Sequence, residues 1–483
     1  MSFNMSNRDQ AMIFPATIED YVPKDAPVRA YDSFVEALNF SRLGIRLLPC
    51  GGAEQYYPKD LLKLIIYGVS YGIRSSRKLE RACYENMSFI WLMGGQKPDY
   101  RTIARFRIRH KEAIKKVLKQ CVRICLDLEL IEGNVLFVDG SKFRADASIN
   151  KTWTKEKCEK HIKKIEERID ALMDDCESTD IEEQNNPSSA KLKEEVQDKT
   201  QLINKIKDVL AILESEDKKS INSTDPDSVK AKGRQGTHAA HNVQSVVDGK
   251  HGLIVHAEAV SQSNDYNQLS GQLKQAVANT GIMPAHVCSD AGYADVDDIK
   301  EIDPRINVIV PSHQQAQKEN GRCPVRPFAK EQFNYNAQKD EYICPEGKPL
   351  RFIGIFADAP NKKRYQASSK ECRGCPHFGD PQQGKCTQAA NGRRLTRLAE
   401  EELKEQLEAN YQRPENQAIY KRRKEFVEHP FGHMKRNLGA GQFMLRGNAK
   451  VNAETALLAT CFNMARMITI LGIPALLAKL STV

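Results

Sequence analysis

Apolar side chains recur at helical spacing over the first part of the chain. Residues 58–67 place four aliphatic side chains on one helical face, and residues 75–83 open with polar residues before an apolar stripe. Two glycines and a proline within residues 94–98 then break the pattern, and apolar positions predict one further helix from about residue 99 to Cys125. The pattern predicts three or four short helices, which is typical of a helical DNA-binding domain or of a plain packing domain.

Strand-like runs follow after residue 130, in the order strand, β-hairpin, helix and strand. Two of the short apolar strands end in an acidic residue, Asp139 and Asp290, and each acid is followed by a small residue. This order predicts an α/β domain with a mixed sheet. The segments are residues 135–138, 242–247, 253–257, 267–277 and 286–290.

Two segments interrupt the α/β pattern. Within residues 151–221, apolar residues repeat in steps of three and four on both sides of a polar stretch that contains Pro187. This spacing predicts a helical hairpin of the coiled-coil type, with Lys199 as a polar residue in its seam. We interpret the hairpin as a structural or partner-binding arm. Residues 318–400 are turn-rich and basic, and helices return from about residue 400.

The charge of the chain is unevenly distributed. Among 483 residues there are 72 Lys and Arg and 63 Asp and Glu, a net charge of +9. Residues 97–124 hold ten basic and two acidic side chains, which indicates either a nucleic-acid-binding face or a solvated helix face. With 40% hydrophobic residues and no apolar run near the 20 residues of a membrane span, we expect a soluble, cytoplasmic protein without a membrane.

The cysteines are of two kinds. There are 13, and most stand singly in apolar settings, as reduced thiols in a cytosolic core do. The exception is a cluster with one Cys-x₂-Cys spacing, which predicts structural Zn²⁺ or, alternatively, unmetallated thiols. His377 and Cys323 are further candidate ligands. The cluster consists of Cys344, Cys372, Cys375 and Cys386.

The acids at the two strand ends are candidate metal ligands. Side chains at strand ends project into the crevice where α/β sheets bind ligands, and carboxylates there can hold Mg²⁺ or Mn²⁺. A two-metal site needs a third acid, for which Glu428 is the best candidate and Glu425 its closest rival. Because basic side chains surround Glu428, it could instead be a salt-bridge partner.

Several blocks of sequence, in order along the chain, are similar to those of one protein family. They are residues 15–45, 71–77, 98–107, 139–148, 224–227, 241–248, 289–293, 427–432 and 443–447, with Asn463 and Arg466. Through them the chain resembles, nearly end to end, bacterial insertion-sequence transposases of the DDE class. The resemblance is closest to the group named after insertion sequence eleven-eighty-two. It implies a ribonuclease-H-like catalytic domain.

The resemblance also implies roles for individual residues. Asp139, Asp290 and Glu428 fall on the catalytic triad, which would hold two Mg²⁺ or Mn²⁺ ions, and Lys435 falls on the basic residue seven positions after the glutamate. The tyrosine and arginine that the family places seven and four positions before that glutamate are here Lys421 and Lys424, with Tyr420, Arg422 and Arg423 displaced by one or two positions. His241 replaces an expected tyrosine. Candidate DNA contacts are Arg101, Arg105, Arg109, Lys421, Arg422, Arg423 and Arg446.

The expected activity is binding of the terminal inverted repeats of an insertion sequence, followed by metal-dependent strand cleavage and strand transfer. We expect double-stranded DNA as partner, a homodimer on DNA, and association with the bacterial nucleoid. A structure-specific nuclease and a catalytically inactive DNA-binding derivative are the alternatives. The expected domains are a helical DNA-binding domain (1–130), a ribonuclease-H-like domain (131–150 and 223–317), an inserted helical hairpin (151–222), an inserted Cys-rich module (318–400) and a C-terminal helical part of the catalytic domain (401–483).

Overall fold

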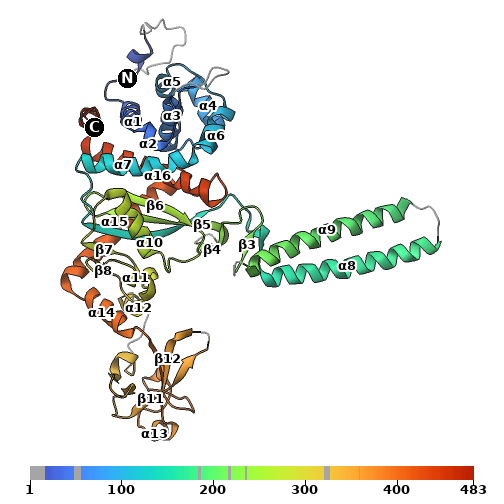
Figure 1. Ribbon diagram of the computed structural model, residues 1–483, viewed down its shortest axis with the longest axis vertical. Coiled ribbons are helices and arrows are strands. Elements are labelled where there is room, and N and C mark those ends of the chain that lie inside the picture. Colours follow the sequence, from blue (N-terminus) through green and yellow to red (C-terminus); the bar gives the residue numbers. More distant parts are fainter. Residues whose placement is uncertain are drawn as a thin grey trace, which may run out of the picture. The chain divides into compact units, whose positions relative to one another are not determined.

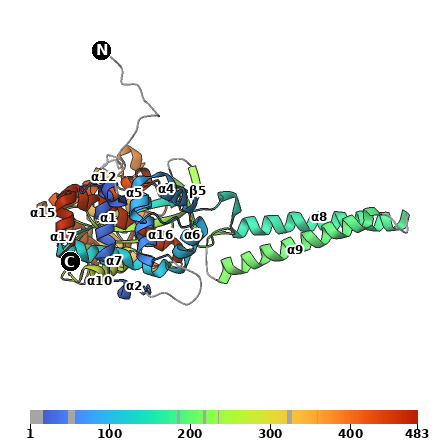
Figure 2. The same ribbon diagram turned by 90° about the horizontal axis from the view of Figure 1, so that it is seen from above.

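The computed structural model describes residues 17–47, 56–182, 187–215, 219–233, 236–319, 327–357 and 359–482 (Figures 1 and 2). The chain divides into two compact units. The first contains residues 1–265, 272–283 and 425–483, and the second contains residues 266–271 and 284–424. Helices and strands occur in both units, which confirms a mixed α/β protein.

The N-terminal part of the first unit is helical, as the periodicity predicts. The single helix predicted from about residue 99 to Cys125 is wrong, because it consists of two helices that meet at His110 (φ −105°, ψ 25°). The ring of His110 packs on Phe106 at 4.6 Å, one turn back. The elements are η1 (Ile18–Tyr21), α1 (Pro27–Glu36), α2 (Phe40–Leu43), α3 (Pro58–Ser70), α4 (Ser76–Glu85), α5 (Met87–Leu92), α6 (Tyr100–Arg109) and α7 (Lys111–Asp127).

Strand β5 (Gly236–Asp248) organises the sheet of the first unit. Strand β1 (Val135–Arg144) pairs along one edge of β5, and β4 (Val229–Gly233) and β6 (Ile254–Val260) share the other, all antiparallel. The prediction that Asp139 ends its strand is wrong. β1 continues for five residues beyond it because its backbone pairs with β5 as far as Arg144, and Asp139 lies opposite Ser245 within that ladder.

Two long helices, α8 (Lys155–Glu182) and α9 (Pro187–Ser215), run side by side in both views (Figures 1 and 2). Short strands β2 (Thr152–Trp153) and β3 (Ile221–Asn222) pair at their base, after the single turn η2 (Ile149–Lys151). A buried cluster of Cys158, Ile206, Leu213 and Ile221 holds the helices together there. Lys199 reaches Glu195 at 3.3 Å, one turn back on its own helix.

The long helix α16 (Asn448–Leu471) packs against α7, α3 and β6. Two of its asparagines bond the backbone of β6: Asn463 exchanges two 2.8 Å hydrogen bonds with Ile254, and the Asn452 amide does the same with Ala259 at 2.6 and 3.2 Å. No single helix among the described residues is long and apolar enough to cross a membrane. Helices α16 and α17 (Ile473–Leu480) meet that criterion only together, as a pair bent by 111°.

A buried ion pair joins the N-terminal helices to α16. Arg74 pairs with Glu454, and both side chains are only 9% exposed. Arg74 also donates to the carbonyl oxygens of Gly439 (2.7 Å) and Gln442 (2.8 Å), while Glu454 accepts from the backbone amides of Met444 and Leu445 at 3.1 and 3.2 Å. Both charges are therefore fully partnered inside the protein.

The second unit contains a parallel pair of strands, β7 (His286–Cys288) and β8 (Asn307–Ile309), and an antiparallel sheet in the order β13-β12-β11-β10-β9. Helix α15 (Pro414–Arg436) begins in this unit and ends in the first. The remaining elements are α10 (Leu269–Thr280), η3 (Ala291–Tyr293), α11 (Val296–Lys300), α12 (His313–Glu319), η4 (Lys330–Gln332), β9 (Asn334–Asn336), β10 (Glu341–Ile343), β11 (Pro349–Phe356), β12 (Ala359–Ala367), α13 (Ser369–Arg373), η5 (Pro381–Gln383), β13 (Arg394–Leu398) and α14 (Glu401–Tyr411).

We predict that Glu454→Gln lowers the free energy of unfolding by about 3 kcal/mol or more, because it leaves the Arg74 guanidinium buried without its counter-charge. Urea denaturation measures the change. Glu85→Gln is the matched control, since the exposed Arg81–Glu85 pair on α4 contributes about 0.5 kcal/mol. Equal losses in both variants would show that the buried pair has no special role.

Candidate active site

One face of strand β1 carries Asp139. Side chains alternate along a strand, so Phe137 and Ser141 share this face, and the Asp139 side chain is half-buried there. Helix α15 packs against the same face: the Phe426 ring stacks on Phe137 at 5.1 Å, and the Lys435 ammonium donates to the Ser141 hydroxyl at 2.6 Å. Contacts from α15 therefore lie on either side of Asp139 along the strand.

The Lys435 ammonium lies close to Asp139. Burial lowers the pKa of Lys435, and the neighbouring ammonium of Lys142 lowers it further, whereas the carboxylate of Asp139 raises it. The ammonium also lies 4.6 Å from the centre of the Phe143 ring. A fixed positive charge thus accompanies Asp139 on this face of the sheet.

Glu428 occupies the same face of α15 as Lys435. Residues 428, 431 and 435 stand three and seven positions apart, which places them on one side of a helix. Phe431 contacts Phe143 with ring centres 6.2 Å apart, so this side of α15 faces β1. The Glu428 side chain is exposed, as a carboxylate must be to meet an external ligand.

Glu425, the rival candidate, has different surroundings. With Phe426 and His429 it lines a cavity of about 360 Å³ whose other walls include Lys250, His251 and Arg466. Glu425 is therefore associated with the turn before β6 and with α16, whereas Glu428 is on the side of α15 that faces β1. This difference favours Glu428 as the acid that acts with Asp139.

A polar cluster that sequence reasoning missed lies on the opposite face of β1. The Asp265 carboxylate accepts hydrogen bonds from Asn242 (2.8 Å), Gln244 (2.7 Å) and Lys142 (3.4 Å). It approaches Gly140 so closely that a Cβ atom there would lie 2.3 Å from the carboxylate oxygen. The small residue after Asp139 was the one sequence signal of this close approach.

Asp290, in the second unit, lies two residues beyond strand β7, which ends at Cys288 and not at the acid as predicted. It caps the short helix η3, because its carboxylate accepts the backbone amide of Gly292 at 2.8 Å. Tyr420 of α15 lies near Asp290, and Arg423 lies beside Tyr420. Burial raises the pKa of Tyr420, Arg423 lowers it, and the charges of Cys288 and Asp290 raise it. The Arg423 guanidinium lies 5.8 Å from the centre of the Tyr420 ring.

Within the part of the chain that the structure describes, no three His, Cys, Asp or Glu side chains are placed to hold a metal ion. Of the predicted ligands, Asp139 and Glu428 belong to the first unit and Asp290 to the second. Their chemistry still suits Mg²⁺, which takes oxygen ligands. Asp139 is half-buried beside a cation, and Glu428 is open to solvent.

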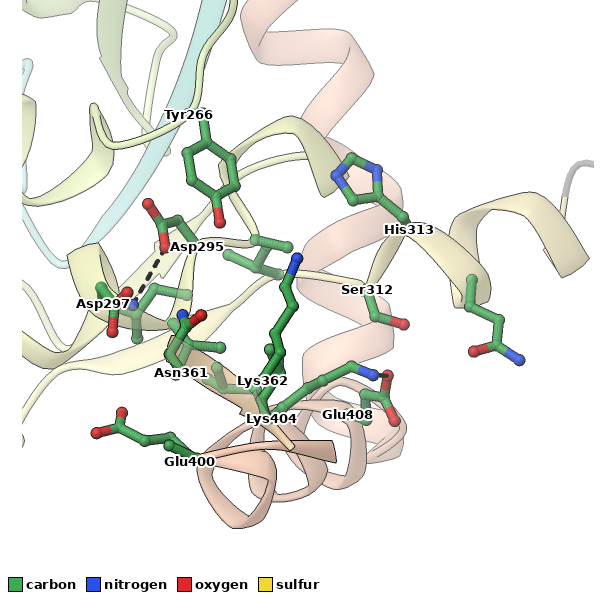
Figure 3. Close-up of a pocket in the computed structure, with 18 of the residues that line it drawn as sticks. Tyr266, Asp295, Asp297, Ser312, His313, Asn361, Lys362, Glu400, Lys404 and Glu408 are labelled. Carbon is green, nitrogen blue, oxygen red and sulfur yellow. Dashed lines mark hydrogen bonds and ion pairs between the residues drawn. The ribbon is translucent and has the colours of Figure 1, made fainter. Parts of the chain in front are cut away.

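A cavity of about 710 Å³ in the second unit lies apart from these acids (Figure 3). Its labelled side chains include four carboxylates but only two lysines, and Lys404 pairs with Glu408 at 3.8 Å. None of Asp139, Asp290 and Glu428 lines it. A lining of mixed charge does not favour a polyanion, so we do not assign the DNA site to this cavity. Its polar lining includes Tyr266, Asp295, Asp297, Ser312, His313, Asn361, Lys362, Glu400, Lys404 and Glu408.

The predicted DNA contacts of helix α6 share one exposed face. Arg101, Arg105 and Arg109 are exposed at four-residue intervals, while Ile103 and Phe106 are buried on the other side. The exposed Arg77, which sequence reasoning missed, extends this face, because its guanidinium lies 5.0 Å from the centre of the Tyr100 ring next to Arg101. Three cations at this spacing can follow a phosphate backbone.

Two other basic residues have partners in the protein itself: Arg107 is half-buried and Arg446 is exposed. Burial lowers the pKa of Arg107 to about 10, and its guanidinium donates to the backbone oxygen of Arg74 at 2.6 Å. Arg446, a predicted DNA contact, donates to the Asp146 carboxylate at 2.9 Å. Lys421 and Arg422 are exposed on α15. The basic surface is therefore smaller than the sequence suggests.

Residues 224–227 and His241, which belong to the blocks noted in the sequence, have a structural role. Asp225 is fully buried, and although burial raises its pKa, the hydrogen bond with His241 (2.9 Å) holds it below the usual value. Asp225 also accepts the amide of Gly447 at 3.1 Å, and Asp227 accepts that of Asn448 at 2.7 Å. These acids hold the amino end of α16.

Two segments of the chain match models of known protein families. Residues 343–468 match the family model described as a transposase DDE domain, a segment that includes Glu428 and Lys435. Residues 343–468 are therefore similar to a transposase DDE domain. Residues 16–109, with the exposed face of α6, match a second model, the transposase domain DUF772. No curated protein and no solved structure matches the chain. The two segments support an insertion-sequence DDE transposase, and DNA as the partner of such a protein.

We predict that reversing Arg101, Arg105 and Arg109 to glutamate weakens DNA binding and flattens its salt dependence. Each lost phosphate contact removes about 0.9 from the slope of log K against log salt concentration, so the slope falls by up to about 2.7. Fluorescence anisotropy with a duplex at several salt concentrations measures it. Reversal of Lys160, Lys164 and Arg168, exposed at the same spacing on α8, is the charge-matched control. An unchanged slope would move the contacts elsewhere, to Lys421 and Arg422 first.

Proposed function

We propose that the protein binds the terminal inverted repeats of an insertion sequence and catalyses metal-dependent cleavage and transfer of DNA strands, in the cytoplasm of a bacterium. The observation that carries the proposal is the environment of Asp139: within a chain that matches a transposase DDE domain, Lys435 and the Glu428 face of α15 pack on the strand face of this acid. The proposal includes a ribonuclease-H-like fold for the sheet. It also includes membership of the group named after insertion sequence eleven-eighty-two.

In this proposal Asp139, Asp290 and Glu428 hold two Mg²⁺ or Mn²⁺ ions. Bound at these carboxylates, the metals would activate a water molecule or a 3′-hydroxyl and stabilise the leaving oxyanion. Asp139 is suited to this role because β1 is hydrogen-bonded along its length and fixes the carboxylate. Asp290 is held through the Gly292 amide. Rigid carboxylates keep the geometry that in-line displacement requires.

In the proposal, the basic residues near the acids, Lys435 and Arg423, contact or position the DNA and do not bind metal. Lys435 is anchored by the Ser141 hydroxyl and stands beside Asp139, so it can contact the phosphate that reacts there. Arg423 lies beside the Tyr420 ring, and Tyr420 lies near Asp290. We assign to Tyr420 and Arg423 the positioning that the family gives to a tyrosine and an arginine one position further along, because helix α15 places Tyr420 near the acid and Arg423 against Tyr420.

The direct test uses a duplex that carries the terminal repeats flanking the gene, incubated with the protein and Mg²⁺, and maps the products on a sequencing gel. Cleavage at the repeat end and joining of that end to a second DNA are the expected results. Cleavage without joining would support a nuclease, and binding without cleavage would support an inactive DNA-binding derivative.

We predict that Asp139→Asn, Asp290→Asn and Glu428→Gln each reduce cleavage by at least about 100-fold and leave DNA binding largely intact. An amide keeps the volume of the carboxyl but loses the charge that the metal needs, and even the loss of residues that only support metal ligands costs 10- to 100-fold. Glu425→Gln is the matched control and should remain active, since Glu425 faces a different cavity. Near-normal cleavage by any triad variant would remove that residue from the site.

The helices α8 and α9 suggest how two DNA ends could be paired, since transposition must bring both together. We propose that they contact a second copy of the chain on DNA. The alternative is that they only pack on each other. Because β2 and β3 pair at the base, residues 155–218 can be replaced by a short Gly/Ser linker between neighbouring chain ends.

We predict that this deletion still binds single ends but no longer forms paired-end complexes in native gels. Binding of single ends serves as the internal control for folding. Paired complexes that survive the deletion would assign dimerisation to another part of the protein.

A further inference from the structure

The four clustered cysteines, which the DNA chemistry does not use, surround one small cavity in the second unit. Cys344, Cys372, Cys375 and Cys386 all line it, and its volume is about 40 Å³. They come from three separate places in the sequence: the turn after β10, the helix α13 with the residues that follow it, and the long loop before β13. A cavity of this size has room for one ion or one water molecule.

The backbone around two of these cysteines directs amide groups at sulfur. The Lys348 amide donates to the Cys344 sulfur at 3.2 Å, in a tight turn that Gly347 (φ +72°) allows. The Arg393 amide donates to the Cys372 sulfur at 3.4 Å. Such donors stabilise negative charge on sulfur, and the thiolate is the form that binds metal.

Gly392 shows how closely the chain approaches the second of these sulfurs. A Cβ atom at this position would lie 3.3 Å from the Cys372 sulfur and 2.7 Å from the backbone oxygen of Ala367, and the backbone adopts φ +85°. Only glycine fits without a shift of its neighbours. The loop before β13 therefore lies against Cys372. Cys386, which belongs to the same loop, lines the cavity together with Cys372.

The module has little else to hold it. Its buried core is the small cluster of Phe333, Tyr342, Leu350, Tyr365, Ala367 and Leu395, and three of the cysteines pack against it. Residues 374–393 contain no regular structure beyond the single turn η5. Small domains with few core residues and long loops need an additional link, such as a metal or disulfides.

We propose that Cys344, Cys372, Cys375 and Cys386 bind one structural Zn²⁺ ion that ties the β10–β11 turn, α13 and the loop before β13 together. In this structure the four thiols stand around the cavity without forming a coordination sphere. Binding of the ion would bring the four sulfurs to about 2.3 Å from it. The spacing Cys372-x₂-Cys375 is common in zinc sites, and the cationic Arg393, bonded to the Cys386 carbonyl at 3.4 Å, offsets the charge of four thiolates.

His377 is not needed as a ligand. Its imidazole lies 3.1 Å from the Glu346 carboxylate and packs on the Phe328 ring, although it lines the same cavity. Cys323, the other substitute that the sequence offered, lies outside the described residues. The proposal therefore assigns the site to four cysteines, and a histidine variant serves as its matched control.

The test measures zinc in the purified full-length protein by mass spectrometry, with Co²⁺ substitution as a second readout. We expect one zinc per chain, and a cobalt spectrum with thiolate charge-transfer and tetrahedral bands. Cys344→Ser and Cys386→Ser should each lose most of the metal, whereas His377→Ala should retain it. Chelation in the wild type should expose four additional reactive thiols, a readout that does not require any variant to fold.

Three results would overturn the proposal: a wild-type chain without zinc that gives no cobalt spectrum, cysteine variants that keep full metal content, or a thiol count that shows disulfides in this cluster. Zinc content does not depend on DNA cleavage. If the protein failed to cleave DNA, the zinc measurement would still stand, and if it bound no zinc, the test of transposase activity would still stand.

Discussion

The first unit depends on the burial of helix α16. Its side chains are inaccessible along most of its length, because α3 and α7 cover one side and strand β6 the other. Polar groups buried at this depth must be partnered, and Asn452, Asn463 and Glu454 each have backbone or ionic partners. The helical region and the sheet thus share one core, rather than forming two domains joined by a linker.

Helix α15 carries two of the proposed site residues, Glu428 and Lys435, to the sheet of this unit. One of its sides lies on the β1 face that carries Asp139, which fixes Lys435 and orients the exposed Glu428 without burying it. Pro430 stands within the helix, and the helix continues through it. A site built on a strand and a helix is more rigid than one built on loops, and this suits the proposed reaction, in which the protein mainly positions charges.

The sequence was informative where the pattern was long and local. Helical periodicity predicted α3, α4 and the long pair α8 and α9, and strand signals located β1, β5 and β6. It failed at the end of β1, because pairing with β5 decides how far that strand continues, and that partner is about a hundred residues away. The sequence also did not predict the break between α6 and α7 at His110, because the apolar spacing continues from one helix into the next.

Candidate site residues were predicted by type, but their surroundings were not. A run of arginines does not reveal that Arg107 is half-buried and bonded to a backbone carbonyl oxygen while Arg105 faces solvent. The sequence ranked Glu428 above Glu425 on α15, but it did not show that Glu425 lines a cavity with Lys250 and Arg466. Apart from the small Gly140, nothing in the sequence pointed to Asp265, because its three hydrogen-bond donors lie on the distant strands β1 and β5.

The Arg74–Glu454 pair has a consequence for how such a chain can change over evolutionary time. Arg74 lies in the segment that matches one family and Glu454 in the segment that matches the other. Recombination that replaced one segment with a counterpart from another element would leave a lone charge in the core unless both partners were inherited together. The two segments are therefore expected to have travelled as a linked pair, even though more than two hundred residues separate them in the chain.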